Sequence, residues 1–158
     1  MWLSDRRGFL LATLALAGCN FAPVHGDGSK FQVLHNAVLV QAPTNRLEFE
    51  LVRHLEVQLG QATAKRYDLL YKLNVDEDII YVSSAQEVNR FSLVGVLEYS
   101  LVDNNGVILL SETAKSFTGY SATGTTVATQ RSKRDAHDRL MAILAKKLAN
   151  SLSTLDRS

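Results

Sequence analysis

The chain contains a single thiol, that of Cys19, which ends the motif Leu16-Ala17-Gly18-Cys19. Upstream lie a positively charged start with Arg6 and Arg7 and an uncharged apolar run over residues 8–17. A positive start, a short apolar run and small residues at a cleavage point together indicate an exported precursor. The two small residues before the cysteine give an enzyme access to the backbone, and the thiol supplies a nucleophile. The pattern therefore predicts an exported precursor with a cleavage point at these small residues and one thiol beside it.

The same motif resembles the lipobox of bacterial lipoproteins, in which diacylglycerol is joined to the thiol and the new amine is acylated. The resemblance implies that residues 1–18 are a signal peptide and that Cys19 carries a covalent lipid, with no further cofactor. A membrane-spanning helix is disfavoured because it needs roughly 20 apolar residues. A core helix would place Arg6 and Arg7 against the helix dipole. A buried free cysteine is common, but this one lies at the cleavage point.

Flanking residues bear on the export route and the destination. The segment Arg6-Arg7-Gly8-Phe9-Leu10-Leu11 is similar to the twin-arginine signal, but arginine pairs are also frequent in general secretion signals, so both routes stay open. In enteric bacteria an aspartate after the lipidated cysteine retains a lipoprotein in the inner membrane. Asn20 occupies that position here, which implies delivery to the outer membrane.

Cleavage would leave 140 of the 158 residues (158 − 18), enough for one domain with its own core. It would also leave 15 basic residues (17 − 2) and 15 acidic residues (16 − 1). A net charge near zero argues against nucleic acid as a partner, and a lipidated Cys19 can form no disulfide. Pro23, Gly26 and Gly28 predict that residues 19–30 are a flexible tether before a domain over residues 31–158.

The domain is predicted to begin with a strand and a helix. Residues 31–40 have the apolar composition of a strand. Asn45 and Glu48 have the spacing of a capping box, and Gly60 closes the helix. Between them an apolar stripe at helical spacing predicts a core-facing surface, formed by Leu47, Leu51, Leu55 and Leu59.

Two alternating strands are predicted next. Residues 67–75 alternate between apolar and polar side chains, and residues 79–82 extend this strand across an irregularity at Glu77-Asp78. A polar loop over residues 83–89 leads to the second alternating strand, 91–102.

A hairpin and a final helix complete the domain. Asp103-Asn104-Asn105-Gly106 predicts a type I′ turn, and residues 107–120 return as a third strand. Its alternation fails near residues 111–115, which indicates a bulge or an edge. Residues 127–155 carry a helical apolar stripe, formed by Leu140, Met141, Leu144, Leu148, Leu152 and Leu155.

These elements predict an α+β fold in the order β-α-β-β-β-α. A first strand that is joined to the next through a helix is expected to lie parallel to it, by a right-handed crossover. Two helices packed on one face of a mixed four-stranded sheet would bury both leucine stripes.

The whole mature chain resembles the LptE family of lipopolysaccharide-assembly lipoproteins, in its alphaproteobacterial form. The order and spacing of several short motifs carry this resemblance: residues 16–23, the strand 90–103 ending in Tyr99-Ser100-Leu101-Val102-Asp103, Phe117-Thr118-Gly119-Tyr120-Ser121, Asp135-Ala136, Arg139-Leu140 and Leu144-Ala145.

In that family the protein plugs the wide LptD barrel of the outer membrane, assists its assembly and takes part in delivering lipopolysaccharide to the cell surface. Barrels of this size enclose a polar, water-filled lumen, which suits a compact domain with a polar surface. Burial of an acyl chain in the bilayer contributes about 0.8 kcal/mol of binding free energy per CH₂. A lipid on Cys19 would therefore hold the domain at the inner leaflet. The resemblance implies an outer-membrane lipoprotein on the periplasmic side, with an LptD-type barrel and lipopolysaccharide as partners.

Arginine and lysine suit the phosphates and carboxylates of lipopolysaccharide through charge-assisted hydrogen bonds. Arg90 is the first candidate because it lies at a hairpin end near a recurrent arginine of the family, and Lys115 on the irregular strand is the second. The remaining candidates, for sugar phosphates or for carboxylates of a barrel wall, are Arg131, Lys133 and Arg134. Each is alternatively an ordinary solvated charge, and Arg131 is spaced to pair with Asp135 on one helix face.

The residue pattern does not predict an enzyme. The four histidines lack the spacing of a metal motif, and the run Asp76-Glu77-Asp78 lacks EF-hand spacing. The alternative function is a free-standing envelope lipoprotein that binds an amphiphile or scaffolds another envelope complex, and a structural lipoprotein without a ligand also stays open. Co-purification with a large barrel would favour the first function, and a monomer with bound lipid the alternative.

Overall fold

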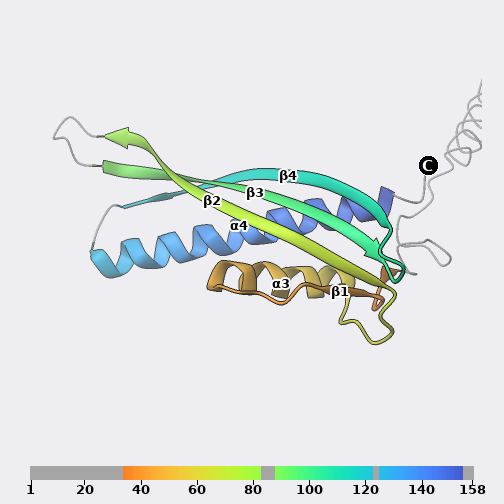
Figure 1. The fold of residues 1–158 in the computed structure, drawn as a ribbon. Helices are drawn as coiled ribbons and strands as arrows, with labels where there is room; N and C mark the ends of the chain where they lie inside the picture. Colours follow the sequence, from red (N-terminus) through yellow and green to blue (C-terminus); the bar gives the residue numbers. More distant parts are fainter. Residues whose placement is uncertain (1–33, 83–87, 123–124, 155–158) are drawn as a thin grey trace, which may run out of the picture.

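The computed structural model describes residues 34–82, 88–122 and 125–154. Its elements in chain order are β1 (Val38–Val40), α3 (Arg46–Leu59), β2 (Tyr67–Val82), β3 (Val88–Asp103), β4 (Ile108–Ser121) and α4 (Thr126–Thr154). The strands form one sheet in the order β1-β2-β3-β4, and both helices pack on the same face of it (Figure 1). β1 runs parallel to β2, and the other neighbours are antiparallel. The predicted α+β fold is confirmed, and one face of the sheet is left open.

Helix α3 begins and ends at the predicted capping residues. The side chain of Asn45 accepts the N–H of Glu48 at 3.0 Å, which satisfies one of the free donors at the helix start. Gly60 has φ 75°, a left-handed conformation that glycine adopts without strain. The predicted stripe is buried except at Leu47, which is half-buried; its buried members are Leu51, Leu55 and Leu59.

Helix α4 packs closely on β3 at Gly95. A Cβ atom at Gly95 would lie 2.9 Å from Cδ1 of Leu144 and 3.1 Å from Cδ2 of Leu140. The absence of a side chain at Gly95 therefore lets α4 seat its leucines against the strand. The residues of α4 that are buried in this core are Ala136, Leu140, Met141, Leu144, Ala145, Leu148, Ala149 and Leu152.

The first strand is shorter than predicted. Of residues 31–40, only Val38–Val40 pair with β2, and residues 31–33 lie outside the described residues. Residues 34–37 form a turn, in which Asn36 has φ 62° and donates its N–H to the carbonyl of Leu59 at 2.9 Å. Because the backbone of this turn is hydrogen-bonded to the C-terminal end of α3, it does not pair with a neighbouring strand.

The turn between β3 and β4 is not the predicted type I′. That turn needs a positive φ at both central residues, but here only Gly106 has one, at 83°. The carboxylate of Asp103 accepts the N–H groups of Asn105 and Val107, each at 2.8 Å. These bonds, the Val107 bond foremost, lower the pKa of Asp103. The aspartate side chain, rather than an Asn-Gly pair, thus sets the turn.

The strand irregularities lie beside the predicted positions. β2 continues through Glu77-Asp78, and its register shifts between Ile79 and Val82 instead. Val88 and Asn89, predicted as loop, belong to β3. β4 is an edge strand as predicted, but its register shift leaves out Leu109 rather than a residue within 111–115.

Side chains of α4 cover the free edge of β4. Nζ of Lys147 donates to the carbonyl of Lys115 at 2.5 Å, and the guanidinium of Arg139 donates to the carbonyl of Gly119 at 3.2 Å. Backbone acceptors that would otherwise be unpaired at a sheet edge are thereby satisfied.

Candidate functional site

Arg90 lies near the end of the sheet that is opposite to the β3–β4 turn, on the open face. Its partner on β4 is Ser121. The next residue, Phe91, packs toward the core and stacks on Tyr120, with ring centroids 5.0 Å apart and an interplanar angle of 10°. Because successive side chains alternate across a strand, the exposed Arg90 points away from the helices. Of the predicted loop beside it, residues 83–87 lie outside the described residues.

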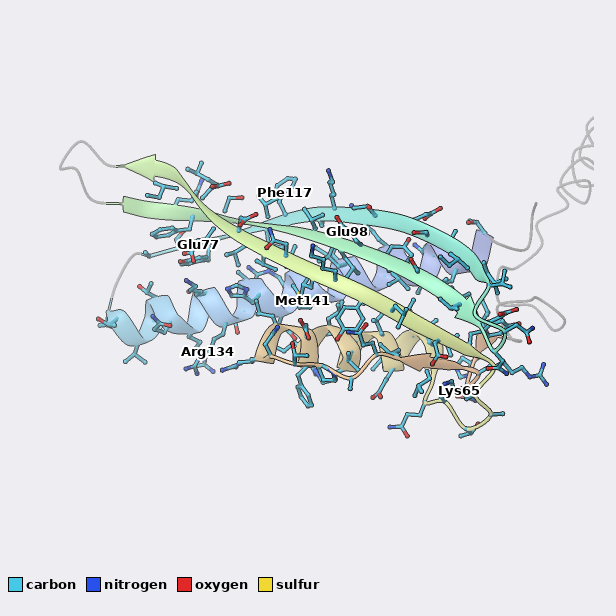
Figure 2. The ribbon with its side chains drawn as sticks, in the orientation of Figure 1. Lys65, Glu77, Glu98, Phe117, Arg134 and Met141 are labelled. Carbon is cyan, nitrogen blue, oxygen red and sulfur yellow. The ribbon has the colours of Figure 1, made fainter. Side chains whose placement is uncertain are left out.

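Lys115 lies on the same open face but not beside Arg90. It pairs with Val96, whereas Arg90 pairs with Ser121, so six residues of β4, or about 20 Å, separate them. Between them lies Phe117, opposite Val94, with 74% of its surface exposed (Figure 2). The open face thus carries a strip with a cation near each end and apolar side chains between, which we call the open-face strip: Arg90, Val94, Val96, Lys115 and Phe117.

The three candidates on α4 lie on the other side of the sheet. Arg131 and Arg134 are exposed, and Arg134 projects away from the strands (Figure 2). Lys133 instead forms an ion pair with Glu77 of β2. Within the described ranges, no ion pair joins Arg131 to Asp135. The structure therefore does not bring these three residues together with Arg90 and Lys115.

The polar cluster around Glu77 was not predicted. One carboxylate oxygen accepts the hydroxyl of Tyr120, and the other accepts Nζ of Lys133. Burial alone would raise the pKa of Glu77, but the hydrogen bonds from Lys133 and Tyr120 outweigh it and lower the pKa. The nearby His137 has its pKa lowered by burial and then by Lys133. A sequence signal existed, since Glu77 continues the core-facing alternation of β2 and a carboxylate there needs a partner.

Replacement of Glu77 by glutamine should reduce the acid sensitivity of the fold. The pKa of Glu77 is lower in the folded state than its ordinary value of 4.5. Its contribution is therefore present above about pH 4.5 and is lost as the pH falls through the lower folded value. We expect Glu77→Gln to be less stable than the native chain at pH 7, by about 1 kcal/mol of unfolding free energy. As the pH falls from 5 to 3, the unfolding free energy of the variant should decrease less than that of the native chain.

Urea unfolding at several pH values measures both effects. Glu98→Gln is the matched control, because Glu98 is exposed on the open face (Figure 2) and forms no ion pair with the described residues. The prediction would be contradicted if the unfolding free energy of Glu77→Gln decreased between pH 5 and 3 by as much as that of the native protein.

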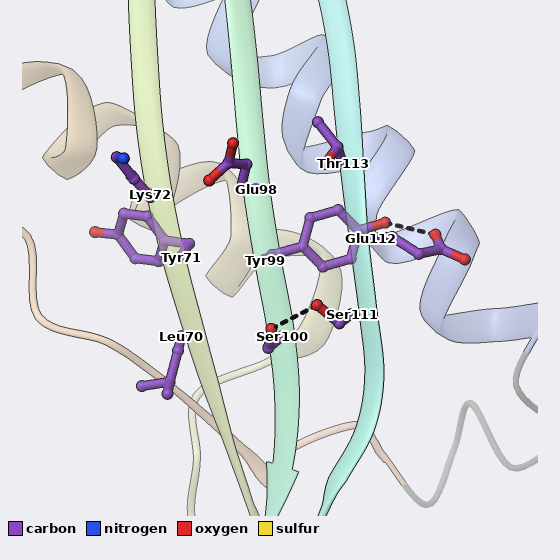
Figure 3. Close-up of a pocket in the computed structure, with 9 residues that line it drawn as sticks. All are labelled: Leu70, Tyr71, Lys72, Glu98, Tyr99, Ser100, Ser111, Glu112 and Thr113. Carbon is purple, nitrogen blue, oxygen red and sulfur yellow. Dashed lines mark hydrogen bonds between the residues drawn. The ribbon is translucent and has the colours of Figure 1, made fainter.

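A shallow depression of about 380 Å³ crosses β2, β3 and β4 between the strip and the β3–β4 turn (Figure 3). Lys72 and Glu98 are register partners there, and the hydroxyls of Ser100 and Ser111 are hydrogen-bonded to each other at 3.0 Å. The depression therefore offers a polar contact surface.

Cys19, the signal peptide and the tether lie outside the described residues. Within residues 34–82, 88–122 and 125–154, no group of three His, Cys, Asp or Glu side chains could hold a metal ion. Nor does a helix in these ranges combine the length and apolar composition needed to cross a bilayer.

Comparison with known proteins identifies relatives of this fold. A family model described as LptE, lipopolysaccharide-assembly, matches residues 36–152. A structure described as a lipoprotein from Caulobacter crescentus CB15 aligns with a TM-score of 0.68 and 20% identity, over 78% of this chain and 93% of that chain. Rare lipoprotein B from Shewanella oneidensis aligns with a TM-score of 0.57 and 10% identity, over 75% and 92%.

A minor lipoprotein from Acinetobacter baumannii aligns with a TM-score of 0.54 and 16% identity, over 75% of this chain and 89% of that chain. At these identities the structural likeness shows a shared fold. No curated protein sequence matches the chain.

Proposed function

Because the chain belongs to the LptE family of lipopolysaccharide-assembly proteins, a family of assembly factors and not of enzymes, we propose that it occupies the lumen of an LptD-type barrel. There it assists assembly of the barrel and takes part in delivering lipopolysaccharide to the cell surface. The elongated body, with one sheet face free and charged residues along α4, suits a polar lumen. The motifs of residues 16–23 and 117–121 support the alphaproteobacterial form of the family.

In this proposal Cys19 carries the lipid, and residues 19–30 tether the domain to the periplasmic side of the outer membrane. The support is the sequence motif Leu16-Ala17-Gly18-Cys19. Arg131 and Arg134 are proposed to face carboxylates of the barrel wall, because both are exposed on the outer side of α4.

Lipopolysaccharide is proposed to contact the open-face strip. The observation that carries this assignment is the arrangement of side chains on the open face of β3 and β4. The cations of Arg90 and Lys115 lie near the ends of the open-face strip, which also holds the apolar Val94, Val96 and Phe117. An amphiphile with phosphates and acyl chains presents both kinds of group, and cations bind phosphate through charge-assisted hydrogen bonds. Lys133 has a lesser part, because Glu77 already neutralises it.

Reversal of the charge at Arg90 should weaken lipopolysaccharide binding. A hydrogen bond to a charged group contributes about 1.5–3 kcal/mol, so we expect Arg90→Glu to raise the dissociation constant about tenfold. Titration of the lipidated, detergent-solubilised protein with purified lipopolysaccharide measures this. Lys146→Glu is the control, because Lys146 is exposed on α4 and lies away from the strip. Equal affinities of the native protein and Arg90→Glu would remove Arg90 from the site.

Mild detergent extraction tests the barrel partnership. Co-purification of the native chain with a large outer-membrane barrel is the expected result. Recovery as a monomer with bound lipid would favour the alternative, a free-standing envelope lipoprotein that carries an amphiphile.

A further inference from the structure

The outer edge of β2 is open along the part of the strand that β1 does not cover. β1 pairs only with residues 67–69 of β2, which continues to Val82 (Figure 1). Gln41 extends the cover a little, because its N–H donates to the carbonyl of Leu69 at 2.9 Å and its side chain accepts the N–H of Tyr71 at 3.3 Å. The cover that the chain itself gives to this edge therefore ends at Tyr71.

Backbone groups beyond this point face away from β3. The N–H and C=O groups of successive residues alternate between the two sides of a strand, and Leu69 and Tyr71 direct theirs to the outer edge. The next residues that do so are Leu73, Val75 and Glu77. Within the described ranges, the backbone of these residues forms no hydrogen bond to another element. Their donors and acceptors line about 13 Å of edge, and such a row is what an added strand pairs with.

The charges beside this edge differ from those beside the other edge of the sheet. On β4, Lys147 and Arg139 already occupy backbone carbonyls. On β2, the neighbouring side chains of the open face are Asp76 and Asp78, and both are exposed. Asp76 accepts the side-chain amide of Asn74 at 2.9 Å, and neither carboxylate forms an ion pair with a residue that the structure describes. The open edge therefore attracts a basic strand and repels an acidic one.

The helix side of the same edge is apolar. Leu73 and Val75 are partly buried against the core, and Ile79, which alternation places on the same side, is 59% exposed. An added strand would cover these side chains with apolar residues of its own. Its other side would meet Asp76 and Asp78, so basic and apolar residues must alternate along it.

We propose that the outer edge of β2, from Leu73 to Glu77, pairs with an extended segment of another polypeptide in which basic and apolar residues alternate. Its basic side chains lie beside Asp76 and Asp78, and its apolar side chains lie against Val75. An identical copy does not fit, because like charges directly opposite one another are unfavourable in a sheet. In the proposed lumen the neighbouring chain is the barrel, so the source of the segment, though not the pairing itself, rests on the proposed function.

Amide hydrogen exchange with a defined peptide tests the pairing. The processed, lipidated chain in detergent is mixed with a peptide of alternating lysine and valine, and exchange is followed residue by residue. A peptide of alternating glutamate and valine is the control. We expect the basic peptide at saturation to slow exchange of the N–H groups of Leu73, Val75 and Glu77 about tenfold or more. The acidic peptide should leave their exchange unchanged.

A pair of charge reversals tests the selection by Asp76. We expect Asp76→Lys to raise the dissociation constant of the basic peptide about fivefold, because an attraction between exposed charges becomes a repulsion. Glu98→Lys is the matched control, because Glu98 is exposed on the same face but lies on β3, which is paired on both sides. It should bind the basic peptide as the native chain does.

Each other outcome overturns the proposal. Unchanged exchange with the basic peptide would mean that the edge accepts no strand. Equal slowing by the two peptides, or equal effects of the two reversals, would mean that the aspartates do not select the partner. Slowing without peptide that grows with protein concentration would identify a second copy instead.

The assay contains no barrel, so its result is separate from the test of the proposed function. Co-purification with a barrel and no slowing by the basic peptide would contradict only this inference. Slowing by the basic peptide without a co-purifying barrel would contradict only the proposed function.

Discussion

Replacement of Cys19 by serine is expected to move the chain from the detergent phase to the aqueous phase. Serine preserves the size of the residue but removes the thiol that the predicted acylation needs. Burial of acyl chains gives about 0.8 kcal/mol per CH₂, so several chains make release of the native protein negligible. Loss of the lipid removes this anchor.

Phase partition in a cloud-point detergent, with the protein freed from any barrel, measures this directly. Asn20→Ala is the control, since it alters the neighbouring residue and preserves the thiol; it should remain in the detergent phase. If Cys19→Ser also stays there, and its mass differs from that of the native protein only by the exchange of sulfur for oxygen, the predicted lipid attachment is wrong.

Truncation of Leu144 to alanine is expected to cost about 3 kcal/mol of unfolding free energy. Leu144 is completely buried, and its Cδ1 lies over Gly95 where α4 packs closely on β3. Removal of a buried leucine side chain costs about 2–5 kcal/mol, because transfer energy is lost and a cavity remains. Domains of this kind have roughly 5–15 kcal/mol in total, so the loss is a large fraction of the stability.

Urea unfolding followed by circular dichroism measures the difference. The neighbouring Ile143 is 37% exposed, and we expect Ile143→Ala to cost less than about 1 kcal/mol. Comparable losses in the two variants would mean that α4 does not seat Leu144 against Gly95.

The elements of this fold are predictable because local chemistry specifies them. The leucine spacing between Asn45 and Gly60 indicates both the helix and its buried face, and alternation in residues 67–75 and 91–102 indicates the strands. The crossover rule then predicts a parallel β1. The predictions of local structure are wrong where hydrogen bonds from a side chain or from a distant backbone group replace those of the expected turn or strand. Asp103 sets the turn with its carboxylate, and the end of α3 engages Asn36, which shortens β1.

The candidate site was less predictable, because it depends on how elements cross. Arg90 and Lys115 could be singled out by residue type, but their common face and the position of Phe117 between them follow from strand register. The pairing of Lys133 with Glu77 joins residues 56 positions apart in the chain. Their meeting depends on how α4 packs across the sheet, for which the sequence holds no local signal.

The covered edge of β4 has a consequence for the time before the chain reaches a partner. A strand from a second molecule would have to displace Lys147 and Arg139 from the carbonyls that they occupy. Beyond the three residues paired with β1, the other border of the sheet carries Asp76 and Asp78, which would meet like charges on an identical copy. Such borders discourage edge-to-edge pairing of sheets. We therefore expect copies of this domain that meet on the way to stay separate rather than to extend one another's sheets.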